Sequence, residues 1–478
     1  MMRNALPPGN AVLNALDSRR QALEGVSLGA VFYFCGGCLF MRGKLFMSFI
    51  KYVSQSVMGM VGISCYILAD TWFVAAALGA EGLAALNLAI VFYSLLNAAG
   101  LMAGIGGATL FSLSLSSGRR GRSEIFSATV ILGSVFAAVF TVAGLFCSGW
   151  IARTLGADEA IFAMTETYLR TILSFSLFFI MNNILLAFVR NDGGPRLAMA
   201  AMVTGSLSNI ALDYIFIFPF GWGIFGAAFA TAIAPMISIA LLSLHFILRR
   251  GSFSLSFSRP RGVYILKMIP LGLSSMVTEL SSAAALAAFN LIILAMAGNT
   301  GVAAYGVVAN LALVELAVFV GIAQGMQPLV SRRRGMGDLA GCRALLCYGA
   351  LFSLGAASLA YGAVFVWARE IAALFNQAGD RLLAAYAEEG LRIYFAGFFF
   401  GGLNVVTAAF FSAAEMPKRG FLISSLRAFL LALPLAALFS RFFGMRGLWF
   451  SFVAAEALTL FIAAAMLRRF AANFQREH

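Results

Sequence analysis

Five carboxylic acids stand inside long apolar runs of this 478-residue sequence, where ionised groups are expensive to place. They are Asp70, Asp213, Glu279, Glu315 and Glu456. A charged side chain at the centre of a bilayer costs roughly 2.5–3.5 kcal/mol on insertion scales. Such an acid therefore faces water, binds a cation or keeps its proton. Each of these three states is one that coupling to protons or Na⁺ requires.

Asn209 and Asp213 are four residues apart, a spacing that places an amide and a carboxylate on the same face of a helix. Oxygen ligands of this kind suit a hard cation. Asp70 lies at a similar depth in its own apolar run, and two neighbouring carboxylates cannot both ionise cheaply. We therefore expect Asp70, Asn209 and Asp213 to bind H⁺ or Na⁺. The sequence leaves the choice between these ions open and indicates no other metal and no cofactor.

The acids of the second half of the chain are less clearly grouped. Glu279 lies in the middle of its apolar run, and Glu315 and Glu456 lie near mid-depth in theirs. They are candidates for a second cation site or for the wall of a cavity. Alternatively, Glu315 or Glu456 forms an ion pair with Arg427, which lies near the middle of its apolar run. The polar residues expected to be structural are Arg427 and Gln327.

The composition places all these residues in a membrane. Of the 478 residues, 61% are apolar and only 11% are charged, whereas a soluble domain has about 25% charged residues. The chain holds about twelve apolar runs long enough to span a bilayer, which takes roughly 20 residues each. We predict an all-α polytopic membrane protein of twelve transmembrane helices. The net charge of +13 then reflects basic loops rather than binding to nucleic acid.

The sequence resembles itself after a displacement of 219 to 222 residues. Gly79 falls on Gly298, and the pair Glu166 and Arg170 falls on Glu388 and Arg392. Hydropathy alone would align helices, but it would not align glycines and an ion pair. Each half has an even number of spans, so both halves enter the membrane in the same direction. We predict two parallel six-helix repeats around a central cavity.

These patterns divide the chain into five segments. The predicted segments are a partly apolar N-terminal extension (1–46), an N-lobe of helices 1–6 (47–250), a linker (251–264), a C-lobe of helices 7–12 (265–470) and a C-terminal tail (471–478). Loops after even-numbered spans hold sixteen Lys and Arg residues, and loops after odd-numbered spans hold five. This bias predicts a plasma-membrane protein whose linker and two termini are cytoplasmic.

Several motifs resemble those of MATE (multidrug and toxic compound extrusion) transporters. They are Asp70-Thr-Trp-Phe-Val, Phe188-Val-Arg190-Asn-Asp-Gly-Gly-Pro195, Asn209-Ile-Ala-Leu-Asp213 and Gly325-Met-Gln327-Pro328. The resemblance covers roughly residues 45–470. It implies alternating-access export of organic, often cationic, compounds in exchange for H⁺ or Na⁺, with no enzymatic activity.

The resemblance also implies site residues. In the DinF-like branch of the family, an N-lobe cation site is formed by the positions that match Asp70, Asn183, Asn209, Asp213 and Thr231 of this sequence. Other members use acids of the C-lobe. Glu279 matches the first of those acids, whereas Asn404 stands in place of the second.

A lipid-linked oligosaccharide flippase of the same superfamily is the alternative. Such flippases usually carry arginines in the central cavity that match a pyrophosphate. The apolar runs of this sequence instead hold five acids and a single base near mid-span, Arg427. An intramembrane enzyme would need paired Asp motifs or an HExxH motif, and the sequence has neither. We therefore expect a monomeric transporter whose partners are small organic substrates and membrane lipids.

The orientation is testable by labelling. In a cysteine-free background, cysteines at Ser123 and Asp338 should react with an impermeant maleimide only from the cytoplasmic side, because the basic loops lie there. Cysteines at Asn299 and Asp380 should react only from outside. Labelling of position 299 from the cytoplasmic side alone would overturn the orientation.

Overall fold

The computed structural model describes residues 43–116, 121–248, 251–254, 262–375 and 380–476. Most of the predicted N-terminal extension, the centre of the linker and the last two residues of the tail lie outside the described residues. The helices of the first half are α3 (Gly43–Ser116), α4 (Arg122–Thr154), α5 (Phe162–Ser174), α6 (Ser176–Asn191), α7 (Pro195–Ile217) and α8 (Gly223–Ile247). Those of the second half are α9 (Gly262–Gly335), α10 (Leu339–Phe375), α11 (Arg381–Tyr394), α12 (Phe398–Ala413), α13 (Pro417–Ser425) and α14 (Ala432–Arg476).

The described helices account for twelve membrane spans. Nine segments are long and apolar enough to cross a membrane, and α5 with α6, bent by 50°, forms a further span. Two of the nine segments, Gly262–Gly335 and Pro417–Phe470, are each divided into two arms by a glycine with positive φ. With these arms taken separately, the chain has twelve spans. The prediction of an all-α membrane protein with twelve helices is therefore confirmed.

Single glycines make three of the sharp turns between spans. Gly79, Gly298 and Gly444 have φ values of 65°, 59° and 57°, a region that residues with a side chain rarely adopt. No atom lies within 4 Å of a Cβ built on any of the three, so the backbone conformation and not packing requires glycine. Because Gly79 and Gly298 are partners in the internal repeat, the two halves make their first turn in the same way.

The fourth and tenth spans also break at matching places. The fourth bends at Phe175, between α5 and α6, and the tenth carries a 3₁₀ turn, Phe395–Gly397, between α11 and α12. A displacement of 222 residues puts Phe175 on Gly397. The repeat seen in the sequence therefore extends to the irregularities of the helices.

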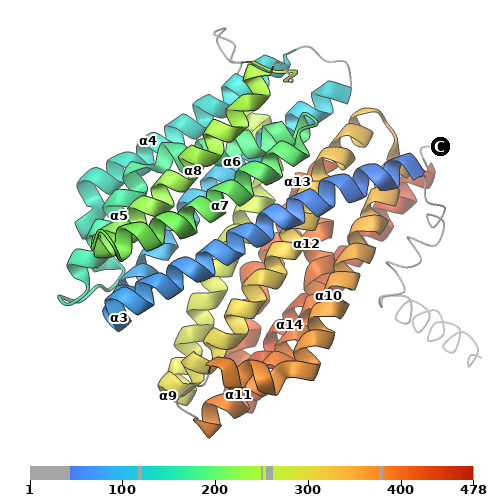
Figure 1. Ribbon diagram of the computed structural model, residues 1–478. Helices are drawn as coiled ribbons and strands as arrows, with labels where there is room; N and C mark the ends of the chain where they lie inside the picture. The colour runs from blue at the N-terminus through green and yellow to red at the C-terminus, as the bar shows by residue number, and fades with distance from the viewer. Residues whose placement is uncertain (1–42, 117–120, 249–250, 255–261, 376–379, 477–478) are drawn as a thin grey trace, which may run out of the picture.

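Two bundles of helices lie side by side, with α4 to α8 on one side and α10 to α14 on the other (Figure 1). The start of α3 departs from the predicted division at residue 47, which placed it in the N-lobe. Leu45, Phe49 and Tyr52 are buried in the hydrophobic core of the second bundle. The ring of Phe49 packs edge-on against Tyr348 and Phe352 of α10, with centroids 5.6 and 5.3 Å apart. In packing terms, the first turns of α3 belong to the second bundle.

The bundles touch backbone to backbone toward the ends of helices that carry Arg196 of α7 and Arg332 of α9, which we call the basic end. A Cβ built on Gly325 of α9 would lie 2.7 Å from Cα of Val53 in α3. A Cβ built on Gly272 of α9 would overlap the carbonyl group of Met102 in α3. These are backbone-to-backbone contacts that leave no room for a side chain. We call them the basic-end seam.

The seam predicts an effect of enlarging Gly272. Gly272→Leu should hold the two bundles apart at the basic end, because the new side chain would overlap Met102. A cysteine placed at Leu101, on the wall between the bundles, should then react faster with an impermeant reagent added from the basic side. Gly306→Leu is the matched control on the same helix, because no atom lies within 4 Å of its Cβ position. Equal labelling in the two variants would contradict the assignment of the seam.

Candidate functional site

Four of the five predicted N-lobe residues lie together inside the first bundle, on α3, α7 and α8. Asn209 and Asp213 have no exposed surface, and Asp70 and Thr231 are buried. Helix α7 begins at Pro195 and is unbroken, so Asn209 and Asp213 point in the same direction one turn apart. Phe73, three residues after Asp70, packs against Tyr214 of α7 with ring centroids 6.3 Å apart, so Asp70 lies on the part of α3 that contacts the helix of Asp213. We call Asp70, Asn209, Asp213 and Thr231 the acidic cluster.

Hydrogen bonds within the acidic cluster leave two carboxylate oxygens without a partner. Asn209 lies 3.2 Å from the Thr231 hydroxyl, and one orientation of its amide satisfies both of its neighbours. In that orientation its nitrogen donates to Oδ2 of Asp213 at 3.1 Å and its oxygen accepts from the hydroxyl and the N–H of Thr231. Oδ1 of Asp213 and Oδ1 of Asp70 are buried and have no hydrogen-bond partner among the described residues. Buried oxygens of this kind fit a bound proton or Na⁺.

The structure places Asn183 away from these bonds, which differs from the expectation. Its amide nitrogen donates to Oδ1 of Asn97 at 2.8 Å and to the carbonyl of Phe179 at 3.3 Å. Asn97 in turn donates to Oε1 of Glu279 at 2.7 Å. This row of side chains runs from α6 through α3 to α9 and so connects the two bundles. Asn183 therefore supports Glu279 rather than the two aspartates.

A cavity of about 230 Å³ lies between the bundles. Its walls come from both arms of α3, from α6, α7 and α8, and from both arms of α9. Thr231 lines it, so the cavity touches a member of the acidic cluster. Among the described lining residues, Glu279 is the only carboxylate and Arg190 the only guanidinium. We call this space the central cavity.

Gln327 lies on the second-bundle side of the central cavity. It lines a smaller pocket of about 50 Å³ together with Glu279 and the hydroxyl groups of Ser274, Thr278 and Ser424.

Glu456 and Asn404 form a different arrangement from the predicted second cation site. Nη2 of Arg427 lies 2.7 Å from Oε1 of Glu456, and Nδ2 of Asn404 donates to Oε2 of Glu456 at 2.8 Å. The two charged side chains keep only 6% and 3% of their surface exposed. Of the two partners left open for Arg427, the structure selects Glu456. A cation is not needed here, because the guanidinium already supplies the positive charge.

Glu315 lies apart from both groups. It is buried on the second arm of α9, and its Oε1 has no hydrogen-bond partner among the described residues. Glu279, Glu315 and Glu456 therefore occupy three different surroundings. The structure does not gather them with Asn404 into one site.

The sequence analysis missed three contributors to the cavity. Arg190 is only 6% exposed, and its Nη1 donates to Oε1 of Gln324 at 2.7 Å. Tyr66 and Tyr93 line the cavity and share a hydrogen bond of 2.9 Å between their hydroxyl groups. One signal was available for Arg190: it stands seven residues after Asn183, and that spacing puts both on one helix face.

At the basic end, Asp192 attaches the start of the linker to the first bundle. Its Oδ2 accepts a hydrogen bond of 2.7 Å from the N–H of Ser252 and lies 2.9 Å from Nε2 of His245. Burial raises the pKa of Asp192, but the hydrogen bonds from His245 and Ser252 outweigh it and hold that pKa below its ordinary value. Phe253 follows and packs on Phe126 with ring centroids 4.6 Å apart. These contacts fix residues 251–254 against α4 and the turn between α6 and α7.

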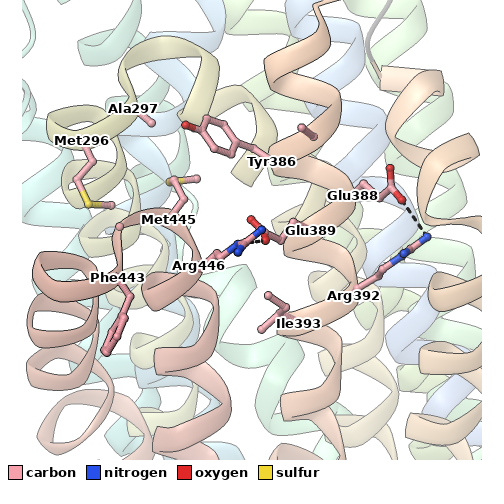
Figure 2. A pocket seen from close by; sticks show the side chains of 12 residues that line it. Met296, Ala297, Tyr386, Glu388, Glu389, Arg392, Ile393, Phe443, Met445 and Arg446 are labelled. Atoms are coloured by element: carbon pink, nitrogen blue, oxygen red, sulfur yellow. Dashed lines mark hydrogen bonds and ion pairs between the residues drawn. The ribbon is translucent and has the colours of Figure 1, made fainter.

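Another pocket, of about 860 Å³, lies elsewhere (Figure 2). It is bordered by the turns at Gly298 and Gly444 and by α11, within the second bundle. Figure 2 shows Arg446 reaching across it to Glu389 of α11, whereas Glu388 and Arg392 pair with each other along α11. Because its charges are already paired and it touches only one bundle, we do not assign it as the functional site.

The buried pair of the second bundle predicts a stability effect. Arg427→Met or Glu456→Met alone should lower the free energy of unfolding by about 3–5 kcal/mol, because either change leaves one buried charge uncompensated. The double substitution should recover most of that loss. The measurement is thermal unfolding of the purified protein. Glu389→Met with Arg446→Met is the matched control on an exposed pair, where about 0–1 kcal/mol is expected. Additive losses at Arg427 and Glu456 would contradict the assignment.

Comparison with solved structures supports the fold. A multidrug resistance MATE family transporter of the MOP superfamily, in an outward-facing conformation, superimposes with a TM-score of 0.86. It is 20% identical, and the match covers 92% of this chain and 99% of that one. A MOP superfamily transporter from Pyrococcus furiosus superimposes with a TM-score of 0.84 at 20% identity, over 90% of this chain and 96% of that one.

Sequence relatives and a family model agree with the structures. The multidrug export protein MepA of Staphylococcus saprophyticus is 23% identical over 431 residues, which cover 90% of this chain and 94% of the relative. MepA of Staphylococcus aureus is 23% identical over 436 residues, with the same coverage. The MatE family model matches residues 56–215 and 270–438, well over half of the sequence. This chain belongs to the MatE family of membrane transporters.

Proposed function

We propose that this protein exports organic compounds in exchange for H⁺ or Na⁺ by alternating access, with the acidic cluster as the coupling site. The observation that carries the proposal is the pair of buried aspartates, Asp70 and Asp213, each with an oxygen that lacks a hydrogen-bond partner among the described residues. No described basic side chain is paired with them. Their charge must therefore be compensated by a proton or a cation that enters from solution.

The acidic cluster is physically linked to the central cavity. Thr231 belongs to both. Tyr66 stands one turn before Asp70 on α3, lines the cavity and is hydrogen-bonded to Tyr93 on the opposite arm of the same helix. A shift of α3 upon binding of a cation would therefore change the cavity wall. Coupled transport requires such a link, because the cation and the substrate must favour different conformers.

The cavity and the relatives support small organic molecules as substrates. Glu279 places a carboxylate on the wall, which favours cationic or neutral amphipaths. The curated relatives are named multidrug export proteins. The flippase alternative is disfavoured, because Arg427 is paired with Glu456 inside the second bundle and leaves Arg190 as the only guanidinium among the described cavity residues. One guanidinium is a poor match for a pyrophosphate.

The same proposal covers the setting of the protein. We infer that it works as a monomer in the plasma membrane, surrounded by lipid, with both termini in the cytoplasm. In that orientation the basic-end seam closes the cytoplasmic side. The described conformation then corresponds to an outward-facing state, which is also the state named for one of the solved neighbours.

The coupling site is tested by neutralising each aspartate. Asp70→Asn and Asp213→Asn should each abolish gradient-driven efflux of a cationic dye from vesicles containing the purified protein, because the site then lacks a carboxylate to bind the ion. Asp158→Asn makes the same change in a loop between α4 and α5, where the carboxylate caps the following turn, and should leave efflux intact. Glu279→Gln should have a milder effect than either aspartate variant.

Proton and Na⁺ gradients are imposed separately in this assay, so the ion that drives wild-type efflux is identified directly. Loss of transport in Glu279→Gln together with normal transport in Asp213→Asn would move the coupling site to the second bundle. Failure of both gradients to drive efflux would overturn the proposed antiport.

A further inference from the structure

We propose that the central cavity selects amphipaths with two poles, a cationic group held by Glu279 and an acidic or strongly hydrogen-bond-accepting group held by Arg190. The inference rests on the proposed function in taking the central cavity as the place where the transported compound binds. It adds a second charged anchor, and with it a narrower class of substrate than a simple cation.

Arg190 has the donors and the position for such an anchor. Its side chain is nine-tenths buried or more, yet it lines the cavity. A guanidinium carries five N–H donors in a planar fork that matches a carboxylate. The hydrogen bond recorded for it runs from Nη1 to the neutral side chain of Gln324 at 2.7 Å. In the described part of the chain, no carboxylate is paired with Arg190.

A buried guanidinium without a countercharge is costly, and a ligand can relieve that cost. In a low-dielectric site, a buried charge needs a partner of opposite sign or several hydrogen bonds. The amide oxygen of Gln324 accepts one hydrogen bond from Arg190 but carries no negative charge. The acidic group of a ligand would supply the missing charge and could accept two parallel hydrogen bonds from the fork.

The opposite pole is Glu279, which accepts a hydrogen bond from Asn97 and has no basic partner among the described residues. Asn97 is bonded to Asn183, and Asn183 stands seven residues before Arg190 on α6. Seven residues of an α-helix rise on the order of 10 Å. Leu186 and Ala187 line the wall between the two poles. The α6 wall of the cavity is therefore apolar between the two charged poles.

The arrangement discriminates against two other classes of ligand. A simple cation can pair with Glu279 but leaves Arg190 with only its amide partner. A polyanion can reach Arg190 but meets the carboxylate of Glu279. A compound that carries both groups, separated by an apolar segment on the order of 10 Å long, matches both poles at once.

The test is equilibrium binding to the purified wild-type protein with no gradient. The probes are ω-(trimethylammonio)alkanoates of increasing chain length and their methyl esters, each competing with labelled tetraphenylphosphonium. The carboxylate and its ester differ only in the group that would face Arg190. We expect the carboxylate to bind about tenfold more tightly than its ester at the best chain length, as a charge-assisted pair predicts. We expect no such preference at the shortest chain length.

Two variants assign the preference to its residue. Arg190→Gln should remove the tenfold preference and leave binding of the esters nearly unchanged, whereas Arg190→Lys should retain part of it. Glu279→Gln should weaken both members of each pair alike. Arg196→Gln, at an exposed position six residues further on, is the matched control and should behave as the wild type.

A wild-type protein that binds esters as tightly as carboxylates at every length overturns the inference, whether or not the variants fold. So does an equal loss for both members of a pair in Arg190→Gln, because Arg190 would then only hold the bundles together through Gln324. Gradient-driven efflux tests the proposed antiport. Binding without a gradient tests the two-pole cavity. The two failures are therefore distinguishable.

Discussion

A carboxylate buried in a membrane needs a positive charge or a proton, and the two halves of this chain meet that need differently. In the second half, Arg427 lies 2.7 Å from Glu456, so the protein supplies the charge itself. In the first half, Asp70 and Asp213 are buried without a basic partner among the described residues. Compensation there must come from outside the chain. This difference is the reason why we propose the first bundle as the part that responds to an ion.

Matching positions of the internal repeat carry different kinds of side chain in the two bundles. A displacement of 219 residues puts Asp70 on Phe289, and one of 221 puts Thr231 on Phe452. Phe452 stacks face to face on Tyr394 with ring centroids 4.0 Å apart. The positions that carry polar side chains in the first bundle thus carry packed aromatic rings in the second. Such packing stabilises the second bundle without any dependence on a bound cation.

The broken helices α3 and α9 connect the acidic cluster, the central cavity and the basic-end seam. Helix α3 carries Asp70 as well as cavity residues on both of its arms, and α9 carries Glu279 and Gln324. The two helices meet backbone to backbone at the basic-end seam, where Gly325 approaches Val53. The start of α3 is held by the core of the second bundle, whereas Val74, one turn after Asp70, lies in the core of the first. A change in the charge of Asp70 therefore acts on a helix that both bundles share.

The sequence by itself determined the number of spans, the repeat with its matching glycines, and the placement of Asn209 and Asp213 on one helix face. These features follow from hydropathy and from spacings within a few residues, which any helix translates into position. Only the tertiary structure decided that Arg427 pairs with Glu456, that Asn183 supports Glu279, and that Arg190 reaches the central cavity. Such partners stand 29 to 182 residues apart in the chain. Their choice depends on which helix faces meet, and no local pattern contains that information.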